Sequence, residues 1–303
     1  MDLKSKIILI SGPTASGKSN FAIKVAKKIN GEIINADSMQ IYKELKILTA
    51  RPKTNDQKGV KHHLYGFQNV RKNFSTGNWL KLAYKKIKEI QKKNKVPILV
   101  GGTGLYFKSL TEGLMKMPNI PIKFRNKIRL LQKQMGQKKF YQKLLEMDPL
   151  IKNKFNSNDV QRSIRAYEIK KFTKKSMTQW FKKTKTLFDK TNFIKIYIDF
   201  PRDDLIIRIK KRVDQMFKEG AILEVRKFNM LNVKNENSSK KVIGIEEIGK
   251  FLKRELDLDE TKERIFIKTR QYAKRQNTWA RGQMMTWQKI DPKKLGLSLK
   301  KLK

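Results

Sequence analysis

The chain has 303 residues, an apolar fraction of 39% and a formal net charge of +44, which is enough for one large domain or two modest ones. It contains no Cys, which excludes disulfides and Cys-based zinc sites, and no run approaches the roughly 18 apolar residues of a membrane span. A strand-like run begins within the first six residues, so no signal peptide fits before it. Together these features predict a cytoplasmic protein.

The basic excess has two explanations. One is a polyanionic partner such as nucleic acid. The other is general amino-acid usage, because 56 of the 71 basic residues are Lys and only 15 are Arg. Residues 122–195 contain 21 Lys and Arg against 5 Asp and Glu, so the middle of the chain is basic as a block. This distribution favours nucleic acid.

The stretch G-P-T-A-S-G-K-S matches the phosphate-binding pattern G-x-x-x-x-G-K-[ST] at every position. A strand-like run precedes it and helical spacing follows, as in nucleotide-binding and ATP-binding proteins. Gly12 and Gly17 let backbone N–H groups turn inward around an anion, and the following helix N-terminus adds partial positive charge. Lys18 supplies a charge to the outer phosphate, and the Ser19 hydroxyl can hold Mg²⁺. The predicted phosphate-binding residues are Gly12, Pro13, Thr14, Ala15, Ser16, Gly17, Lys18 and Ser19.

A second strand is predicted at residues 32–36, directly after Gly31, which we interpret as the C-cap of the first helix. The strand ends at Asp37-Ser38-Met39-Gln40. In open α/β sheets ligands lie at the carboxyl ends of the strands, so Asp37 is expected near the phosphate loop. Its carboxylate could be a Mg²⁺ ligand, a general base or a helix cap.

A third strand is predicted at residues 96–100, and it runs into the turn Gly101-Gly102-Thr103-Gly104. The Thr103 hydroxyl is expected at the same sheet edge as Asp37, and it could also be a helix N-cap. The adjacent pair His62-His63 is interpreted as structural, because neighbours on a strand point to opposite faces and chelate a metal poorly.

The later chain divides into a basic helical block and a return to α/β character. Helices are predicted at residues 124–135 and 160–172, and a strand at 193–198. The predicted fold class is α/β, a P-loop NTPase-like parallel sheet flanked by helices. Its catalytic core comprises residues 1–117 and 193–303, and residues 118–192 form a helical insertion. In that insertion Arg162 and Arg165 share a helix face and could reach phosphates.

Five motifs, in order along nearly the whole chain, resemble those of the tRNA dimethylallyltransferases, also called tRNA isopentenyltransferases, of the IPP transferase family. The first motif alone occurs in many NTP-binding proteins, whereas the next two make the resemblance specific. The motifs are G-P-T-A-S-G-K-S at 12–19, A-D-S-M-Q-I-Y at 36–42, G-G-T-G-L-Y at 101–106, N-D-V-Q-R at 158–162 with Arg165-Ala166, and T-R-Q-Y-A-K-R-Q at 269–276.

The resemblance implies transfer of a dimethylallyl group from dimethylallyl diphosphate to N6 of the adenine on the 3′ side of the anticodon in tRNA. It implies that the phosphate loop holds the diphosphate, that Mg²⁺ on Ser19 assists its departure, and that Asp37 and Thr103 are catalytic. The expected protein is a monomer with no membrane contact, and the insertion clamps the anticodon stem-loop. The residues expected to contact tRNA are Asp37, Ser38, Met39, Gln40, Thr103, Arg125, Gln161, Arg162, Ser163, Ile164 and Arg165.

One departure from the family pattern is Val242-Ile243-Gly244-Ile245-Glu246, where an aromatic and then a basic residue usually follow the Gly, so tRNA contacts there are in doubt. Three alternatives stay open. A small-molecule kinase would leave the basic insertion unexplained, a prenyltransferase of free adenine nucleotides would not need it, and a non-catalytic RNA-binding module would leave the phosphate loop unexplained.

Overall fold

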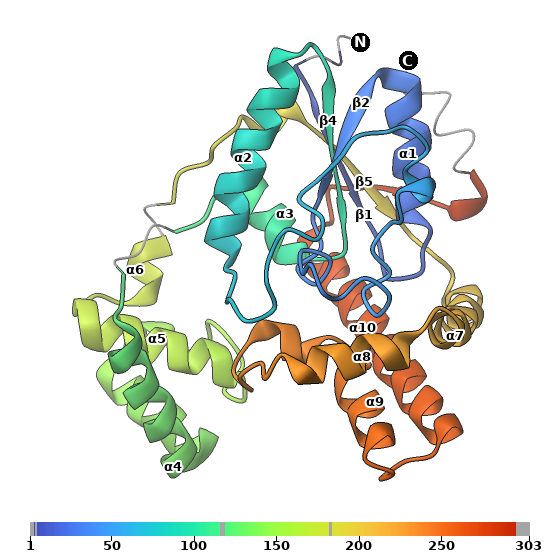
Figure 1. Cartoon of the computed structure of the whole chain (residues 1–303). Helices are drawn as coiled ribbons and strands as arrows, with labels where there is room; N and C mark the ends of the chain where they lie inside the picture. Colours follow the sequence, from blue (N-terminus) through green and yellow to red (C-terminus); the bar gives the residue numbers. More distant parts are fainter. Residues whose placement is uncertain (1–2, 4, 116–118, 182–183, 295–303) are drawn as a thin grey trace. The chain divides into compact units, whose positions relative to one another are not determined.

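In the computed structural model of the chain, residues 3, 5–115, 119–181 and 184–294 are described. The chain forms two compact units, residues 1–111 with 187–303 and residues 112–186 (Figure 1). None of the described helices is long and apolar enough to cross a membrane. The strands are β1 (Ile7–Ser11), β2 (Gly31–Asn35), β3 (His62–His63), β4 (Val96–Gly101), β5 (Phe193–Ile198) and β6 (Gln288–Ile290). The α-helices are α1 (Lys18–Ile29), α2 (Thr76–Lys92), α3 (Gly104–Thr111), α4 (Ile122–Met147), α5 (Val160–Thr173), α6 (Met177–Phe181), α7 (Arg202–Lys218), α8 (Ala221–Met230), α9 (Ile245–Leu252) and α10 (Leu258–Gln283).

The first unit is built around a parallel sheet with the strand order β3-β2-β4-β1-β5-β6. Every residue of β1 and β4 is buried, as expected for strands of a parallel sheet covered on both faces. Ile8 and Ile10 pack with Phe21 of α1, and Figure 1 shows α1 and α2 on opposite sides of the strands. The predicted fold class is confirmed. The sequence pattern missed β3 and β6, because strands of two and three residues are too short to show an alternation.

The predicted role of Gly31 is wrong. Asn30 is the C-cap of α1, with a left-handed φ of 52°, a conformation that Asn tolerates better than most residues. Gly31 is instead the first residue of β2, and a Cβ there would lie 2.6 Å from Cδ1 of Ile98 and 3.0 Å from the carbonyl oxygen of Val96. Gly31 is therefore required by close packing against β4.

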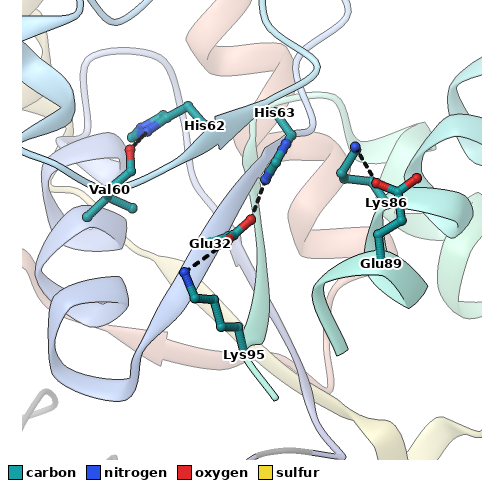
Figure 2. A network of polar contacts seen from close by, with 7 residues as sticks. All are labelled: Glu32, Val60, His62, His63, Lys86, Glu89 and Lys95. Carbon is teal, nitrogen blue, oxygen red and sulfur yellow. Dashed lines mark hydrogen bonds and ion pairs between the residues drawn. The ribbon is translucent and has the colours of Figure 1, made fainter. Parts of the chain in front are cut away.

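The two His residues have structural partners at the outer strand of the sheet. Nε2 of His63 lies 2.6 Å from one carboxylate oxygen of Glu32, and the other oxygen accepts a 3.0 Å hydrogen bond from Nζ of Lys95 (Figure 2). Nδ1 of His62 lies 2.7 Å from the carbonyl oxygen of Val60. Glu32 is buried, so these contacts satisfy a carboxylate that would otherwise be costly to bury. Within the described residues, no cluster of three His, Asp or Glu could hold a metal ion.

The helices of the first unit that follow β5 form a separate apolar cluster with residues 41–48. The last helix, α10, begins with a capping box in which Asp257 accepts a hydrogen bond from the backbone N–H of Glu260. It packs against α7, α9 and α3, which places its middle beside the carboxyl ends of the central strands.

The second unit consists of α4, α5, α6 and their connections. The helical backbone of α4 is interrupted at Gly136, where φ is 70° and ψ is 163°, so the first predicted helix of this block ends where the sequence indicated. Phe140 and Tyr167 pack with ring centroids 5.0 Å apart. The sequence predicted an insertion at residues 118–192, whereas the second unit of the structure spans residues 112–186.

Candidate active site

A cavity of about 700 Å³ lies at the carboxyl ends of the central strands, within the first unit. It brings together the phosphate loop after β1, the Asp37–Gln40 segment after β2 and the Gly101–Gly104 turn after β4. These three segments are separated in sequence, and the parallel order of their strands places them at one edge. The lining also includes side chains of two helices, namely Arg208, Arg212, Tyr272, Arg275, Gln276 and Trp279.

The phosphate loop has the backbone of an anion nest. Ala15 and Gly17 adopt left-handed conformations, with φ of 62° and 83°, and α1 begins at Lys18. Gly12 does not have a positive φ. A Cβ on it would lie 2.9 Å from Oγ of buried Ser16 and 3.2 Å from Cβ of Ile198, so it must be Gly for lack of space. The left-handed turn and the helix N-terminus direct backbone N–H groups toward a bound anion.

Cations gather around this loop. Burial lowers the pKa of Lys18 to about 8, although the charge of Asp37 opposes the shift, and the Lys18 ammonium donates to the carbonyl oxygen of Pro13 at 3.1 Å. Burial likewise lowers the pKa of Arg212, whose guanidinium donates to Oγ1 of Thr14 at 2.6 Å. A partly desolvated lysine and arginine beside a helix N-terminus attract a multivalent anion more strongly than they would in water.

Among the described residues that line the cavity, Asp37 is the only one with a carboxylate side chain. Its Oδ1 accepts a 2.9 Å hydrogen bond from the backbone N–H of Met39, which fixes the side chain at the end of β2. Burial and the Asp37 charge raise the pKa of Tyr65 and Tyr272 well above the usual range. Asp37 lines the same cavity as Lys18 and both tyrosines, so its carboxylate and the phosphate loop share one site.

Thr103 lies beside Asp37, as predicted. Its Oγ1 accepts a hydrogen bond from the backbone N–H of Ser38 at 2.9 Å and donates to Oγ of Ser38 at 3.2 Å. Gly101 permits this approach, because a Cβ there would lie 2.0 Å from the carbonyl oxygen of Ala36. Thr103 also directly precedes α3, where a helix cap was predicted, but these two hydrogen bonds of its hydroxyl join it to the segment after β2.

Gln40 and the segment 45–50 form another wall of the cavity. The Gln40 amide donates to the carbonyl oxygens of Thr49 and Ala50 at 2.9 and 3.1 Å. The Glu224 carboxylate of α8 accepts hydrogen bonds from three successive backbone N–H groups, those of residues 46–48, at 2.7 to 2.9 Å. This wall is therefore held by α8 on one side and by the Asp37–Gln40 segment on the other.

The remaining predicted tRNA contacts belong to the second unit. Arg125 and Arg165 both contact the buried carboxylate of Glu168, at 3.3 and 2.9 Å. Of these three arginines Arg162 is the most exposed, with 64% of its side chain exposed although it pairs with Asp159. Gln161 is exposed on the same helix, whereas Ser163 and Ile164 are buried. These two buried residues therefore offer almost no surface to an RNA.

The sequence pattern alone did not single out Arg208, Arg212 or Gln276 for this cavity. Arg208 and Arg212 are four residues apart on α7 and share a helix face, a signal that the high background of Lys and Arg hides. Gln276 hydrogen-bonds the backbone N–H of Thr14 across 262 residues of sequence, a relationship that no local pattern reveals.

The comparisons with known proteins agree with this site. A family model described as IPP transferase matches residues 40–283. The chain is 62% identical over 303 residues to a tRNA dimethylallyltransferase of Pelagibacter ubique, covering all of this chain and 97% of that one. It is 43% identical over 283 residues to a tRNA dimethylallyltransferase of Rickettsia felis, covering 93% and 91% of the two chains.

Solved structures give the same assignment. The full-length tRNA isopentenylpyrophosphate transferase of Bacillus halodurans superposes with a TM-score of 0.72 and 31% identity, covering 98% of this chain and 95% of that one. A eukaryotic dimethylallyltransferase acting on tRNA superposes with a TM-score of 0.80 and 28% identity, covering 95% of this chain and 74% of that one.

The fold and cavity thus define an α/β protein of the phosphate-loop class that is equipped to hold a multivalent anion beside a carboxylate. Within that class, the family match over most of the chain is decisive: the chain belongs to the IPP transferase family.

Proposed function

We propose that this chain transfers a dimethylallyl group from dimethylallyl diphosphate to N6 of the adenine on the 3′ side of the anticodon in tRNA and releases diphosphate. The observation that carries the proposal is one cavity that joins an anion-binding loop to the Asp37–Thr103 pair. An anion site and a carboxylate are the two elements that prenyl transfer to an amine requires. The names of the relatives, which are dimethylallyltransferases of tRNA, support it.

The first requirement is a base for the nucleophile. The lone pair of adenine N6 is delocalised into the ring, so the amine attacks weakly unless it loses a proton as the bond forms. In the proposed reaction N6 bonds to C1 of the dimethylallyl group, the bond from C1 to the diphosphate oxygen breaks, and Asp37 takes one N6 proton. The Thr103 hydroxyl, held at Ser38, hydrogen-bonds the reacting region.

The second requirement is stabilisation of the leaving group. Diphosphate gains negative charge as the carbon–oxygen bond breaks, and fixed positive groups placed around it stabilise the transition state more than the ground state. Backbone N–H groups at the N-terminus of α1, together with Lys18 and Arg212, would hold this charge. Arg212 is the arginine proposed for this role, because it contacts the loop at Thr14.

Mg²⁺ fits the oxygen-rich lining of this site. Mg²⁺ uses one or two protein oxygens and otherwise binds water and substrate phosphates, and Ser19 and Asp37 line the same cavity. Ser19 would hold the ion, which neutralises part of the diphosphate charge when bound.

To react in tRNA, the adenine must leave its stack, at a free-energy cost of about a few kcal/mol. Ser38, Met39 and Gln40 would hold it, while Arg125, Gln161, Arg162 and Arg165 contact the anticodon stem-loop. The monomeric state and the cytoplasmic location expected from the sequence stay predictions.

One assay tests the proposal. The protein is incubated with labelled dimethylallyl diphosphate, Mg²⁺ and either unmodified tRNA or AMP, with a Lys18→Ala variant as the matched control. Label in tRNA that depends on Lys18 supports the proposal. Label in AMP alone identifies a free-nucleotide prenyltransferase, and no label in either acceptor removes the prenyl-transfer assignment for this chain.

A further inference from the structure

Gln276 is the point at which α10 contacts both glycine-rich segments of the cavity. Its Oε1 accepts a 2.8 Å hydrogen bond from the backbone N–H of Thr14, and its Nε2 donates a 3.0 Å hydrogen bond to the carbonyl oxygen of Gly102. One side-chain amide therefore joins the phosphate loop to the turn that carries Thr103. An amide suits this position because it offers a donor and an acceptor at once, whereas a carboxylate only accepts.

The glycine turn is shaped around α10. A Cβ on Gly102 would lie 2.1 Å from Nε2 of Gln276, and a Cβ on Gly104 would lie 2.3 Å from Cε3 of Trp279, three residues further along the same helix. Gly102 has no positive φ, so its backbone accepts other residues. A side chain at position 102 is excluded because the Gln276 amide occupies the space that its Cβ would need.

Thr14 is held from a second side. Arg212 of α7 donates to its hydroxyl, while Gln276 accepts from its backbone N–H. The phosphate loop is thus fixed at one residue by two helices. Of these two contacts, the one from Gln276 extends to a second segment of the cavity, since its Nε2 reaches Gly102.

We propose that Gln276 is a positioning residue that sets the separation between the diphosphate on the phosphate loop and the Asp37–Thr103 pair, an inference that rests on the function proposed above. Reacting atoms must approach within about 3–3.5 Å in the correct alignment, and a misplacement of about 1 Å can cost about 100-fold in rate. Loss of the amide leaves both anion binding and the base intact. It should therefore affect turnover more than binding.

The first test compares Gln276→Ala and Gln276→Glu with Gln271→Ala, an exposed residue of the same helix that lies outside this cavity. We expect kcat to fall by about 10-fold to 100-fold in both Gln276 variants, with KM for both substrates and the affinity for inorganic diphosphate changed less than about threefold. Gln276→Glu should fail because its carboxylate cannot donate to the Gly102 carbonyl. A normal kcat in Gln276→Ala, or a loss of diphosphate affinity as large as its loss of kcat, would overturn the proposal.

The second test uses Gly102→Ala, alone and combined with Gln276→Ala. Alone, the new Cβ displaces Nε2 of Gln276 and should slow turnover about as much as Gln276→Ala does. In the combined variant the next atom near that Cβ is the Gly12 carbonyl oxygen at 3.7 Å, so the second change should add almost nothing. Losses that multiply in the double variant would show two independent effects and contradict a shared contact.

These outcomes are distinct from failure of the proposed function. That function fails if Lys18→Ala binds inorganic diphosphate as tightly as the unchanged protein does, since the loop would then not be the diphosphate site. The positioning role is judged from Gln276 and Gly102 variants, with the melting temperature of each compared with that of Gln271→Ala.

Discussion

The backbone N–H of Ser38 donates a 2.9 Å hydrogen bond to Oγ1 of Thr103, so the ends of β2 and β4 are joined directly beside Asp37. The backbone N–H of Thr103 in turn donates to the carbonyl oxygen of Ala36 at 3.2 Å. The proposed base is therefore carried by backbone that is held on both sides, which restricts where its carboxylate can lie. Such restriction is what a group acting on one proton of a bound substrate requires.

Replacement of Asp37 by Asn should abolish turnover while tRNA binding survives. The amide oxygen of Asn can still accept from the backbone N–H of Met39, as Oδ1 of Asp37 does, but it cannot take a proton. We expect kcat to fall by about 10²–10⁴-fold, measured by transfer of labelled prenyl group, with the dissociation constant for tRNA within a few-fold of normal. An equal loss of tRNA affinity would mean that Asp37 only positions the adenine.

Diphosphate binding should be linked to proton uptake at Lys18. Its pKa in the ligand-free protein is lowered to about 8 by burial, so the amine is largely neutral above pH 8 and must gain a proton to pair with diphosphate. Affinity should therefore fall as pH rises from 7 to 9, approaching about tenfold per pH unit above the pKa.

Calorimetry at pH 8.5, in two buffers that differ in ionisation enthalpy, measures this uptake directly. Lys18→Met removes the titrating amine and should bind diphosphate more weakly and take up fewer protons. Equal proton uptake in the variant and the unchanged protein would assign the titration to diphosphate itself.

Acid should destabilise the protein through the outer strand of the sheet shown in Figure 2. Burial lowers the pKa of His63 below its usual value, although its hydrogen bond to the Glu32 carboxylate opposes the shift, and burial lowers the pKa of His62 as well. Burial alone would raise the pKa of Glu32, but hydrogen bonds with His63 and Lys95 bring it below its usual value. Since the unfolded chain binds protons more tightly, stability is complete well above pH 6.5 and falls as pH decreases through that value, with a further loss below about pH 4.5.

The urea midpoint measured from pH 8 to pH 5 tests this expectation. A His62→Gln, His63→Gln variant contains no imidazole, because the chain has two His. Its midpoint should change less over this range than that of the unchanged protein. An identical pH dependence in both proteins would place the titrating groups elsewhere.

tRNA affinity should fall steeply with salt, because Lys and Arg that neutralise phosphates release counterions. Arg162 is largely exposed, and Arg162→Ala should weaken binding to all tRNAs similarly and reduce the slope of log K against log salt by about 1. Glu168→Gln is the structural comparison, since it removes the carboxylate that holds Arg125 and Arg165 and should lower the melting temperature. A flat salt response would assign most of the net charge to amino-acid usage.

The central strands and the edge at which the site lies were predictable from sequence. Buried parallel strands are continuous apolar runs, and the glycine-rich loop, Asp37 and Thr103 each follow such a run directly. The sequence also predicted a basic, mostly helical block over residues 118–192. The confirmed fold class and family follow from these local patterns and from the order of the motifs.

The parts that the sequence did not predict depend on tertiary contacts. Arg212 and Gln276 reach Thr14 from helices 198 and 262 residues away, and neither contact leaves a periodic signal. The motif at 269–276 contained Gln276 without assigning it a role. At residue 31 the pattern indicated a helix cap, whereas the actual constraint was the approach of Ile98 from a neighbouring strand.

The outermost strands of the sheet, β3 and β6, have two and three residues. An exposed strand edge is a template on which another chain can pair, and long flat edges promote aggregation. Here a foreign strand would find only a few unpaired backbone groups on either side. The brevity that hid β3 and β6 from the sequence pattern thus protects the sheet from edge-to-edge association.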